Sequence, residues 1–255
     1  MCVNRALRRS RLKILAAEEA ATVSIVVASH DRPSLLEIAV ACANRQQSAR
    51  VLEVVVVDDS SLPIPDWIRD TCDVVEVPRS TPLGDKLNIG ISRTTGSILM
   101  KWDDDDFYGP RYVDHLARAL SVTNAQVVFA QPFLVFDANS RRLHLTDETR
   151  CSGATLTFRR TLWEQVPFRA VEEATDSEFL LDVIDRHGVD ACRGVDLGEN
   201  FVQLRHGTHL WTRMPDGRPV EEYVAECVPV AKPVEDIVGT RVQETWLGLG
   251  TGALR

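Results

Sequence analysis

The chain has 255 residues, of which 44% are hydrophobic and 26% charged. This composition supports one full-sized core and excludes a disordered, collagenous or disulfide-scaffold protein. The formal net charge of −8 argues against nucleic acid as a partner, because phosphate contacts need clustered Lys and Arg. The chain also contains no apolar run of the roughly 20 residues that cross a bilayer, so we expect no transmembrane segment.

Residues 1–21 are expected to form a basic N-terminal extension outside the main domain. Its apolar stretch from Leu12 to Ala17 is too short for a secretory signal. A solvated extension is the favoured interpretation, and peripheral contact with an anionic membrane surface is the alternative. The six cysteines show neither a C-x-x-C pair nor a zinc-type pairing with His, which favours reduced thiols and a cytoplasmic location.

The first part of the main domain alternates predicted strands and helices. Residues 22–28 form a β-branched run typical of a strand buried on both faces, and Pro33 begins a helix that reaches about residue 47. The later elements in this part are a strand at 51–57, a short helix at 65–70, a strand at 73–77, a helix at 85–93 and a strand at 97–102. This order predicts a doubly wound, mostly parallel α/β sheet.

The pattern changes after a predicted helix from residue 110 to about 121. Further strands are expected at 126–130, 133–137, 141–145 and 153–158, the middle two as an antiparallel hairpin, and a helix is expected at 178–187. The chain becomes irregular from about residue 216. We therefore predict a main domain at 22–215 and a C-terminal arm or tail at 216–255.

Three polar clusters follow predicted strands, at Ser29 to Arg32, Asp58-Asp59 and Asp103 to Asp106. Ligands of doubly wound sheets bind beyond the carboxyl ends of the strands. Taken singly, such clusters are also common in turns and helix caps. Four consecutive carboxylates, however, repel one another and need a cation or full solvation. Because these four adjoin an apolar strand, they favour a Mg²⁺ or Mn²⁺ site over an exposed acidic loop.

Four segments in this order resemble a family 2 glycosyltransferase with the GT-A fold. They are SIVVASHDRP, VVVVDDSS, KLNIGISRTTGSILMKWDDDDFYGP and TDSEFLLDVIDRHG, and the resemblance covers Thr22 to Arg213. It implies a doubly wound, mostly parallel sheet with a smaller antiparallel part on the acceptor side. It also implies an inverting enzyme that moves a sugar from a nucleotide-diphosphate donor, by family habit a UDP-sugar, to an acceptor hydroxyl.

The resemblance assigns the residues of the nucleotide-sugar site. Ala28 and His30 would lie along the nucleotide, Asp59 would accept a hydrogen bond from uracil N3–H, and Lys86 would approach the diphosphate.

The D-x-D motif corresponds to Asp103-x-Asp105. Asp105 would bind the metal, and Asp103 would face the ribose or a metal-bound water. Asp104 is placed beside Asp103 at the nucleotide sugar, and Asp106 has the stronger functional claim of the two remaining aspartates.

An inverting transfer needs a carboxylate that accepts the proton of the attacking hydroxyl. The resemblance places this base at Asp176, with Glu178 as the substitute; the alternative is that Asp176 only caps a helix. His206 would be a further metal ligand, with His209 as the alternative. Trp211 is best placed to stack on a sugar, and core packing is expected for three other tryptophans, Trp102, Trp163 and Trp246.

Two other functions compete with this interpretation. A nucleotidyltransferase that makes a nucleotide sugar would carry a Gly-rich basic loop after the first strand, and ASHDRP contains no glycine. A phosphoacceptor receiver domain would begin with the VVVVDDSS strand, but a complete strand-helix unit precedes it here. The sequence does not identify the donor sugar or the acceptor, which could be a glycan, a lipid-linked group, a small molecule or a protein.

Overall fold

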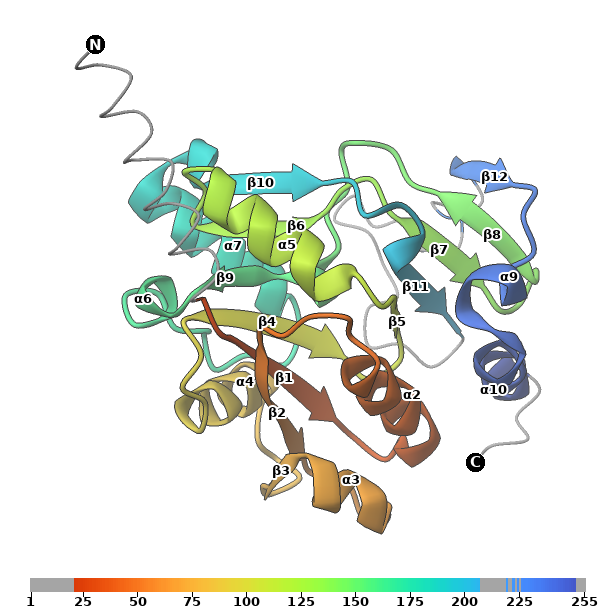
Figure 1. Ribbon diagram of the computed structural model, residues 1–255, viewed down its shortest axis with the longest axis horizontal. Helices are drawn as coiled ribbons and strands as arrows, with labels where there is room; N and C mark the ends of the chain where they lie inside the picture. Colours follow the sequence, from red (N-terminus) through yellow and green to blue (C-terminus); the bar gives the residue numbers. More distant parts are fainter. Residues whose placement is uncertain (1–20, 207–218, 220–221, 223, 225, 251–255) are drawn as a thin grey trace.

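The computed structural model describes residues 21–206, 219, 222, 224 and 226–250 (Figure 1). The elements of its first half are β1 (Val23–Ser29), α2 (Pro33–Asn44), β2 (Val51–Asp58), α3 (Asp66–Thr71), β3 (Asp73–Glu76), α4 (Leu83–Ser92), β4 (Ile98–Asp103), β5 (Phe107–Tyr108) and α5 (Tyr112–Val122). The second half contains β6 (Val127–Ala130), β7 (Leu134–Asp137), β8 (Arg142–Leu145), β9 (Thr157–Arg159), α6 (Arg160–Trp163), α7 (Thr175–His187), β10 (Cys192–Val195), β11 (Phe201–Arg205), β12 (Val228–Val230), α9 (Glu235–Val238) and α10 (Thr240–Gly250).

The main sheet has the strand order β10-β6-β9-β4-β1-β2-β3. Strand β1 pairs in parallel with β2 and β4, whereas β9 runs antiparallel between β4 and β6. The carboxyl ends of β1, β2 and β4 therefore meet at one edge, where Ala28 lies opposite both Val57 and Asp103. The predicted doubly wound, mostly parallel sheet is confirmed.

A second sheet with the order β12-β8-β7-β11-β5 lies beside the main one (Figure 1). The hairpin of β7 and β8 is antiparallel, as predicted. The two-residue strand β5 was not predicted, because among the described residues it pairs only with the distant β11, where Tyr108 lies opposite Phe201. This pairing attaches the segment that follows the four aspartates to the second sheet.

Apolar side chains fill both faces of the main sheet. Ile25 and Val27 of β1 belong to the cluster that includes α2 and α5, and Val26 belongs to the cluster that includes α4 and α7. This alternation explains why the strand reads as a continuous apolar run. Trp102 and Trp246 are fully buried, which confirms the expected core packing for these two.

Trp163 packs against the cluster that includes α4 and α7, as expected, although it is only half-buried and its indole N–H donates to Asn88 at 2.8 Å. The strand predicted at 153–158 is partly wrong, since residues 153–155 form a 3-10 turn before β9. Helix α7 begins at Thr175, three residues earlier than predicted.

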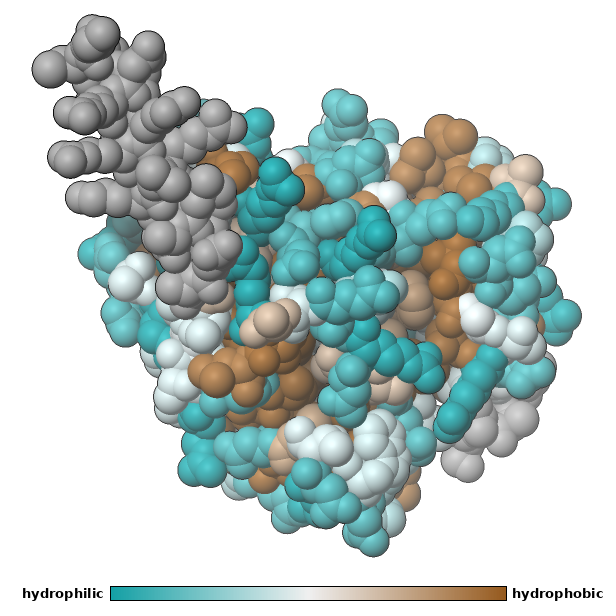
Figure 2. Space-filling model, viewed as in Figure 1, coloured by the Kyte–Doolittle hydropathy of each residue, from teal (hydrophilic) through white to brown (hydrophobic). Residues whose placement is uncertain are grey.

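Within the described residues, no helix is long and apolar enough to span a membrane. Most side chains on the face seen in Figure 2 are hydrophilic, with smaller apolar patches between them.

Candidate active site

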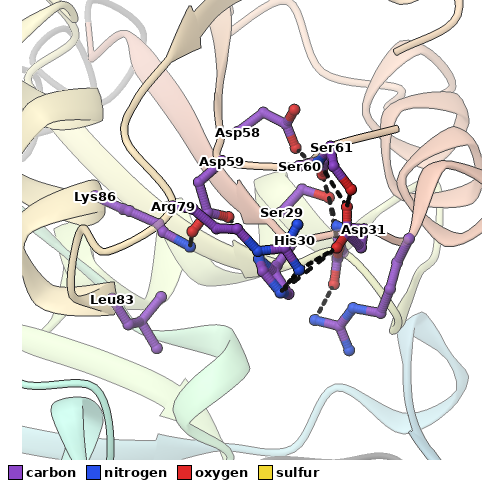
Figure 3. A network of polar contacts seen from close by, with 12 residues as sticks. Ser29, His30, Asp31, Asp58, Asp59, Ser60, Ser61, Arg79, Leu83 and Lys86 are labelled. Carbon is purple, nitrogen blue, oxygen red and sulfur yellow. Dashed lines mark hydrogen bonds and ion pairs between the residues drawn. The ribbon is translucent and has the colours of Figure 1, made fainter. Parts of the chain in front are cut away.

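The loops that follow β1 and β2 are tied together by Asp31. Its carboxylate accepts hydrogen bonds from the backbone N–H of Ser61 at 2.7 Å and from Arg79, and its own backbone N–H donates to Ser60 (Figure 3). The Ser61 N–H contributes most to lowering the pKa of Asp31 to about 2. Asp31 adopts the left-handed region with φ of 49°, which Asp tolerates better than most residues. This network holds together the loops at the carboxyl ends of β1, β2 and β3.

Behind this loop, Asp59 is buried between two basic side chains. Lys86 Nζ of α4 lies 2.7 Å from Asp59 Oδ2, and His30 Nδ1 lies 2.9 Å from Asp59 Oδ1 (Figure 3). Asp58, the preceding residue, instead lines a cavity of about 340 Å³ together with Ser60, Arg69 and other residues that follow β2 and β3. Burial raises the pKa of Asp58.

Asp104 is fully buried within the four consecutive aspartates, Asp103 to Asp106, which we call the acidic motif. It accepts a hydrogen bond from Ser29 Oγ at 2.8 Å and pairs with Arg32 at 2.7 Å. The other terminal nitrogen of Arg32 lies 2.9 Å from Asp105 Oδ2. Burial raises the pKa of Asp104 to about 7, although Arg32 opposes this shift. The guanidinium of Arg32 therefore offsets part of the negative charge of both Asp104 and Asp105.

The remaining aspartates converge on one point. Asp103, Asp105 and Asp106 each place one carboxylate oxygen within 4.8 Å of the other two. Asp106 is buried and accepts the backbone N–H of Leu204 in β11 at 2.9 Å, and burial together with Asp105 raises its pKa well above the usual value. His206 Nε2 lies 3.3 Å from Asp105 Oδ2. Such a group of carboxylates and an imidazole is suited to a divalent cation.

A buried lysine connects this cluster to helix α7. Lys101 Nζ lies 2.8 Å from Asp103 Oδ1, 3.0 Å from both carboxylate oxygens of Asp176, and 3.3 Å from the Gly153 carbonyl. Burial alone would lower the pKa of Lys101, but the charges of Asp103 and Asp176 outweigh it and raise the pKa above its usual range. Lys101 is therefore charged at neutral pH.

Asp176 lies in the first turn of α7, and the cap position is Ala174, which makes no side-chain cap hydrogen bond. The alternative that Asp176 caps the helix is therefore wrong. Its carboxylate packs closely on Gly153, where an added Cβ would lie 2.6 Å from Asp176 Cγ. Glu178 faces elsewhere, because it pairs with the exposed Arg169.

The model of the family described as glycosyl transferase family 2 matches residues 24–175. The chain belongs to this family. A member of the family is a nucleotide-sugar glycosyltransferase, so the nucleotidyltransferase and receiver-domain alternatives are excluded. A comparison with curated proteins gave no match.

Among solved structures, this family 2 glycosyltransferase is similar to glucosyl-3-phosphoglycerate synthase from Mycobacterium tuberculosis. One such structure, in complex with Mn²⁺, UDP and glucosyl-3-phosphoglycerate, has a TM-score of 0.57 at 20% identity, with 82% of this chain and 77% of that chain covered. Another, with Mn²⁺, UDP-glucose and phosphoglyceric acid, has a TM-score of 0.57 at 19% identity, with 90% and 82% covered. At these identities the likeness shows the GT-A fold alone.

The glycosyltransferase fold brings most of the predicted site residues to one sheet edge. They are Ala28, His30, Asp59, Lys86, Asp103, Asp104, Asp105, Asp176 and His206. No contact found among the described residues joins Glu178 to the acidic motif. His209 and Trp211 lie outside the described residues.

Sequence reasoning assigned no role to Arg32, Lys101 or Gly153. For Lys101 a signal was present, because Lys is almost never fully buried unless it is paired, and this one interrupts the apolar strand ILMKW next to the four aspartates. Arg32 and Gly153 gave no such signal, since their partners are about 70 and 20 residues away in the chain.

Proposed function

We propose that this glycosyltransferase inverts the configuration of the sugar as it transfers it from a UDP-sugar to an acceptor hydroxyl, with Mn²⁺ or Mg²⁺ at the acidic motif. The observation that carries the proposal is the contact of Asp103 and Asp176 with the same ammonium group of Lys101. Lys101 thereby holds Asp103, which the proposal places at the donor, next to Asp176, the candidate base on α7. The Mn²⁺, UDP and UDP-glucose in the similar synthase structures support the donor and the metal.

The metal would be held by Asp105 and His206, with Asp103 and Asp106 beside them. The fit rests on carboxylates crowded within 4.8 Å of one another and on Asp106 Oδ2, which is buried without a hydrogen-bond partner among the described residues. Oxygen-rich groups of this kind suit Mn²⁺ and Mg²⁺. A cation bound there would neutralise the charge that develops on the leaving diphosphate.

The nucleotide would lie along the ends of β1 and β2. At these ends Ala28 lies opposite Asp103, and the carboxylate of Asp59 is held by His30 and Lys86, so Ala28, His30 and Asp59 are the proposed contacts of the nucleotide. Asp59 is the proposed acceptor of the uracil N3–H, and Lys86, which now pairs with Asp59, would turn toward the diphosphate. Asp103 and Asp104 complete the proposed nucleotide-sugar site.

Asp176 is the proposed base that takes the proton of the acceptor hydroxyl as its oxygen attacks the anomeric carbon. Its carboxylate is half-buried and directed at Lys101 beside the acidic motif. Glu178 was the predicted substitute, but its pairing with Arg169 favours Asp176. The acceptor, the cytoplasmic location and the domain limits at residues 21/22 and 215/216 stay predictions.

A donor screen tests the proposed function. Binding and hydrolysis of UDP-, GDP- and dTDP-sugars are measured with Mn²⁺ and with EDTA, for the wild type, for Asp105→Ala and for the control Asp73→Asn, which alters a surface pair with Arg93. We expect Mn²⁺-dependent binding of a UDP-sugar that Asp105→Ala loses and Asp73→Asn keeps. Failure of every nucleotide sugar to bind with metal, or normal turnover by Asp105→Ala, would overturn the proposal.

A further inference from the structure

Lys101 occupies a position where the fold would accommodate an apolar residue. It lies in β4, between Met100 and Trp102, which are both fully buried. Because side chains alternate along a strand, Leu99 and Lys101 face the same side of the sheet, the side covered by α4 and α7. Lys101 is only 3% exposed there. Burying an ammonium costs several kcal/mol unless its charge and its donors are matched.

The match at Lys101 comes from three different parts of the chain. Its acceptors are the carboxylate of Asp103 at the end of β4, the carboxylate of Asp176 in the first turn of α7, and the carbonyl of Gly153 in the 3-10 turn. An ammonium group has three N–H donors, and these three acceptors are sufficient to use all of them. Lys101 therefore brings a backbone carbonyl and two carboxylates from three parts of the chain into contact with one ammonium group.

We propose that Lys101 is a positioning residue that holds the carboxylate of Asp176 at a fixed place relative to Asp103, so that the acceptor side and the donor side of the reaction are assembled by one side chain. This inference rests on the proposed function, which makes Asp176 the base. Lys101 itself touches neither substrate in this scheme and acts through Asp176.

Charge compensation alone does not account for the arrangement. Asp176 lies in the first turn of α7, where the helix dipole already favours a carboxylate. Replacing a buried ion pair by well-packed apolar residues is often neutral or stabilising, so stability gives little reason for a lysine here. What the lysine adds is a direction for the carboxylate of Asp176, because it donates a hydrogen bond to Oδ2 at 3.0 Å and lies within ion-pair distance of Oδ1, also at 3.0 Å.

The test compares Lys101→Met, Lys101→Gln, Asp176→Asn and the double variant Lys101→Met/Asp176→Asn. The matched control is Lys232→Met, which removes a surface pair with Glu199. For each protein the measurements are kcat and KM for hydrolysis of UDP-glucose with Mn²⁺, the dissociation constant of UDP with Mn²⁺, the melting temperature, and a crystal structure of the Lys101 variants.

We expect Lys101→Met to lower kcat by about 100-fold, the cost of a base displaced by about 1 Å, while KM and UDP affinity change by less than about threefold. The double variant should be no slower than Asp176→Asn, because Lys101 acts only through Asp176. Lys101→Gln, which keeps a donor for one carboxylate, should lose at least tenfold, and it decides the question where Lys101→Met does not fold.

Two kinetic or binding results overturn the role of Lys101, and so does one structural result. One is a kcat within threefold of the wild type in a folded Lys101 variant. The other is a loss that appears in UDP affinity, which would assign Lys101 to Asp103 alone. A wild type that does not bind UDP with Mn²⁺ instead refutes the proposed function. The crystal structure remains informative in that case, since an Asp176 carboxylate that does not move in the Lys101 variants refutes the positioning role by itself.

Discussion

Gly153 offers a test of the site that removes no charged group. The structure has no side chain at this position because the carboxylate of Asp176 fills the space. A Cβ at residue 153 would lie 2.6 Å from Asp176 Cγ and 2.7 Å from Asp176 Cβ, and closer still to Oδ2. Ordinary van der Waals contact begins near 3.4 Å. In Gly153→Ala, the carboxylate of Asp176 therefore has to move by about 1 Å.

Such a shift is expected to affect the reaction much more than the stability. A base displaced by about 1 Å lowers the rate by roughly 100-fold. The carboxylate of Asp176 can rotate away from the added methyl group, whereas Asp176 Cβ at 2.7 Å moves only with the backbone, so the turn and α7 also have to separate slightly. The lost conformational freedom of glycine in the unfolded chain contributes about 0.4–1 kcal/mol in the opposite direction. We predict a kcat for UDP-glucose hydrolysis about 100-fold below the wild type, with a melting temperature within a few degrees of it.

Gly198→Ala is the matched control, because it should give the opposite pattern. Gly198 has φ of 52° and nothing within 4 Å of an added Cβ, so alanine there is strained without any clash. The strain costs about 1–2 kcal/mol of stability and should leave kcat unchanged. The assay is steady-state hydrolysis with Mn²⁺ beside thermal unfolding of both variants. A kcat for Gly153→Ala within threefold of the wild type would refute the idea that Asp176 must lie where it does.

Three further predictions concern separate parts of the molecule. Asp31→Asn should lose about 1 kcal/mol of unfolding free energy at pH 6, because the ionised carboxylate, with its pKa lowered to about 2, stabilises the fold above about pH 4. Denaturation at several pH values should show that this difference from the wild type vanishes as the pH falls through 2. Arg32→Met should tighten Mn²⁺ binding without nucleotide by roughly tenfold, because Arg32 competes for Asp105 Oδ2; unchanged affinity in calorimetry would contradict this. Trp246→Ala should lower the unfolding free energy by about 3–5 kcal/mol in urea titrations, because this fully buried ring of α10 belongs to the core.

Local patterns in the sequence were sufficient for strands β1 to β4 and β6 of the main sheet and for helices α2 to α5, whereas β10 at its edge was not predicted. The β-branched runs at residues 22–28 and 51–57 lie where β1 and β2 were found, and Pro33 begins α2 as its fixed φ predicts. The secondary-structure predictions were wrong where contacts with a part of the chain distant in sequence determine the backbone conformation. Strand β5 is formed by its pairing with the distant β11, and Gly153 belongs to a 3-10 turn packed against α7 rather than to a strand.

The sequence by itself determined that the acidic motif and Asp59 lie together at the carboxyl ends of the strands, because both follow local strand patterns and the strand ends of a parallel sheet converge. Only the tertiary structure decided how the charges are compensated. Arg32 lies about 70 residues before its partner Asp105, and Lys101 contacts Asp176 across 75 residues. The reason is physical: a buried charge must be matched by whatever group the packing brings near, and packing is not a property of any short segment.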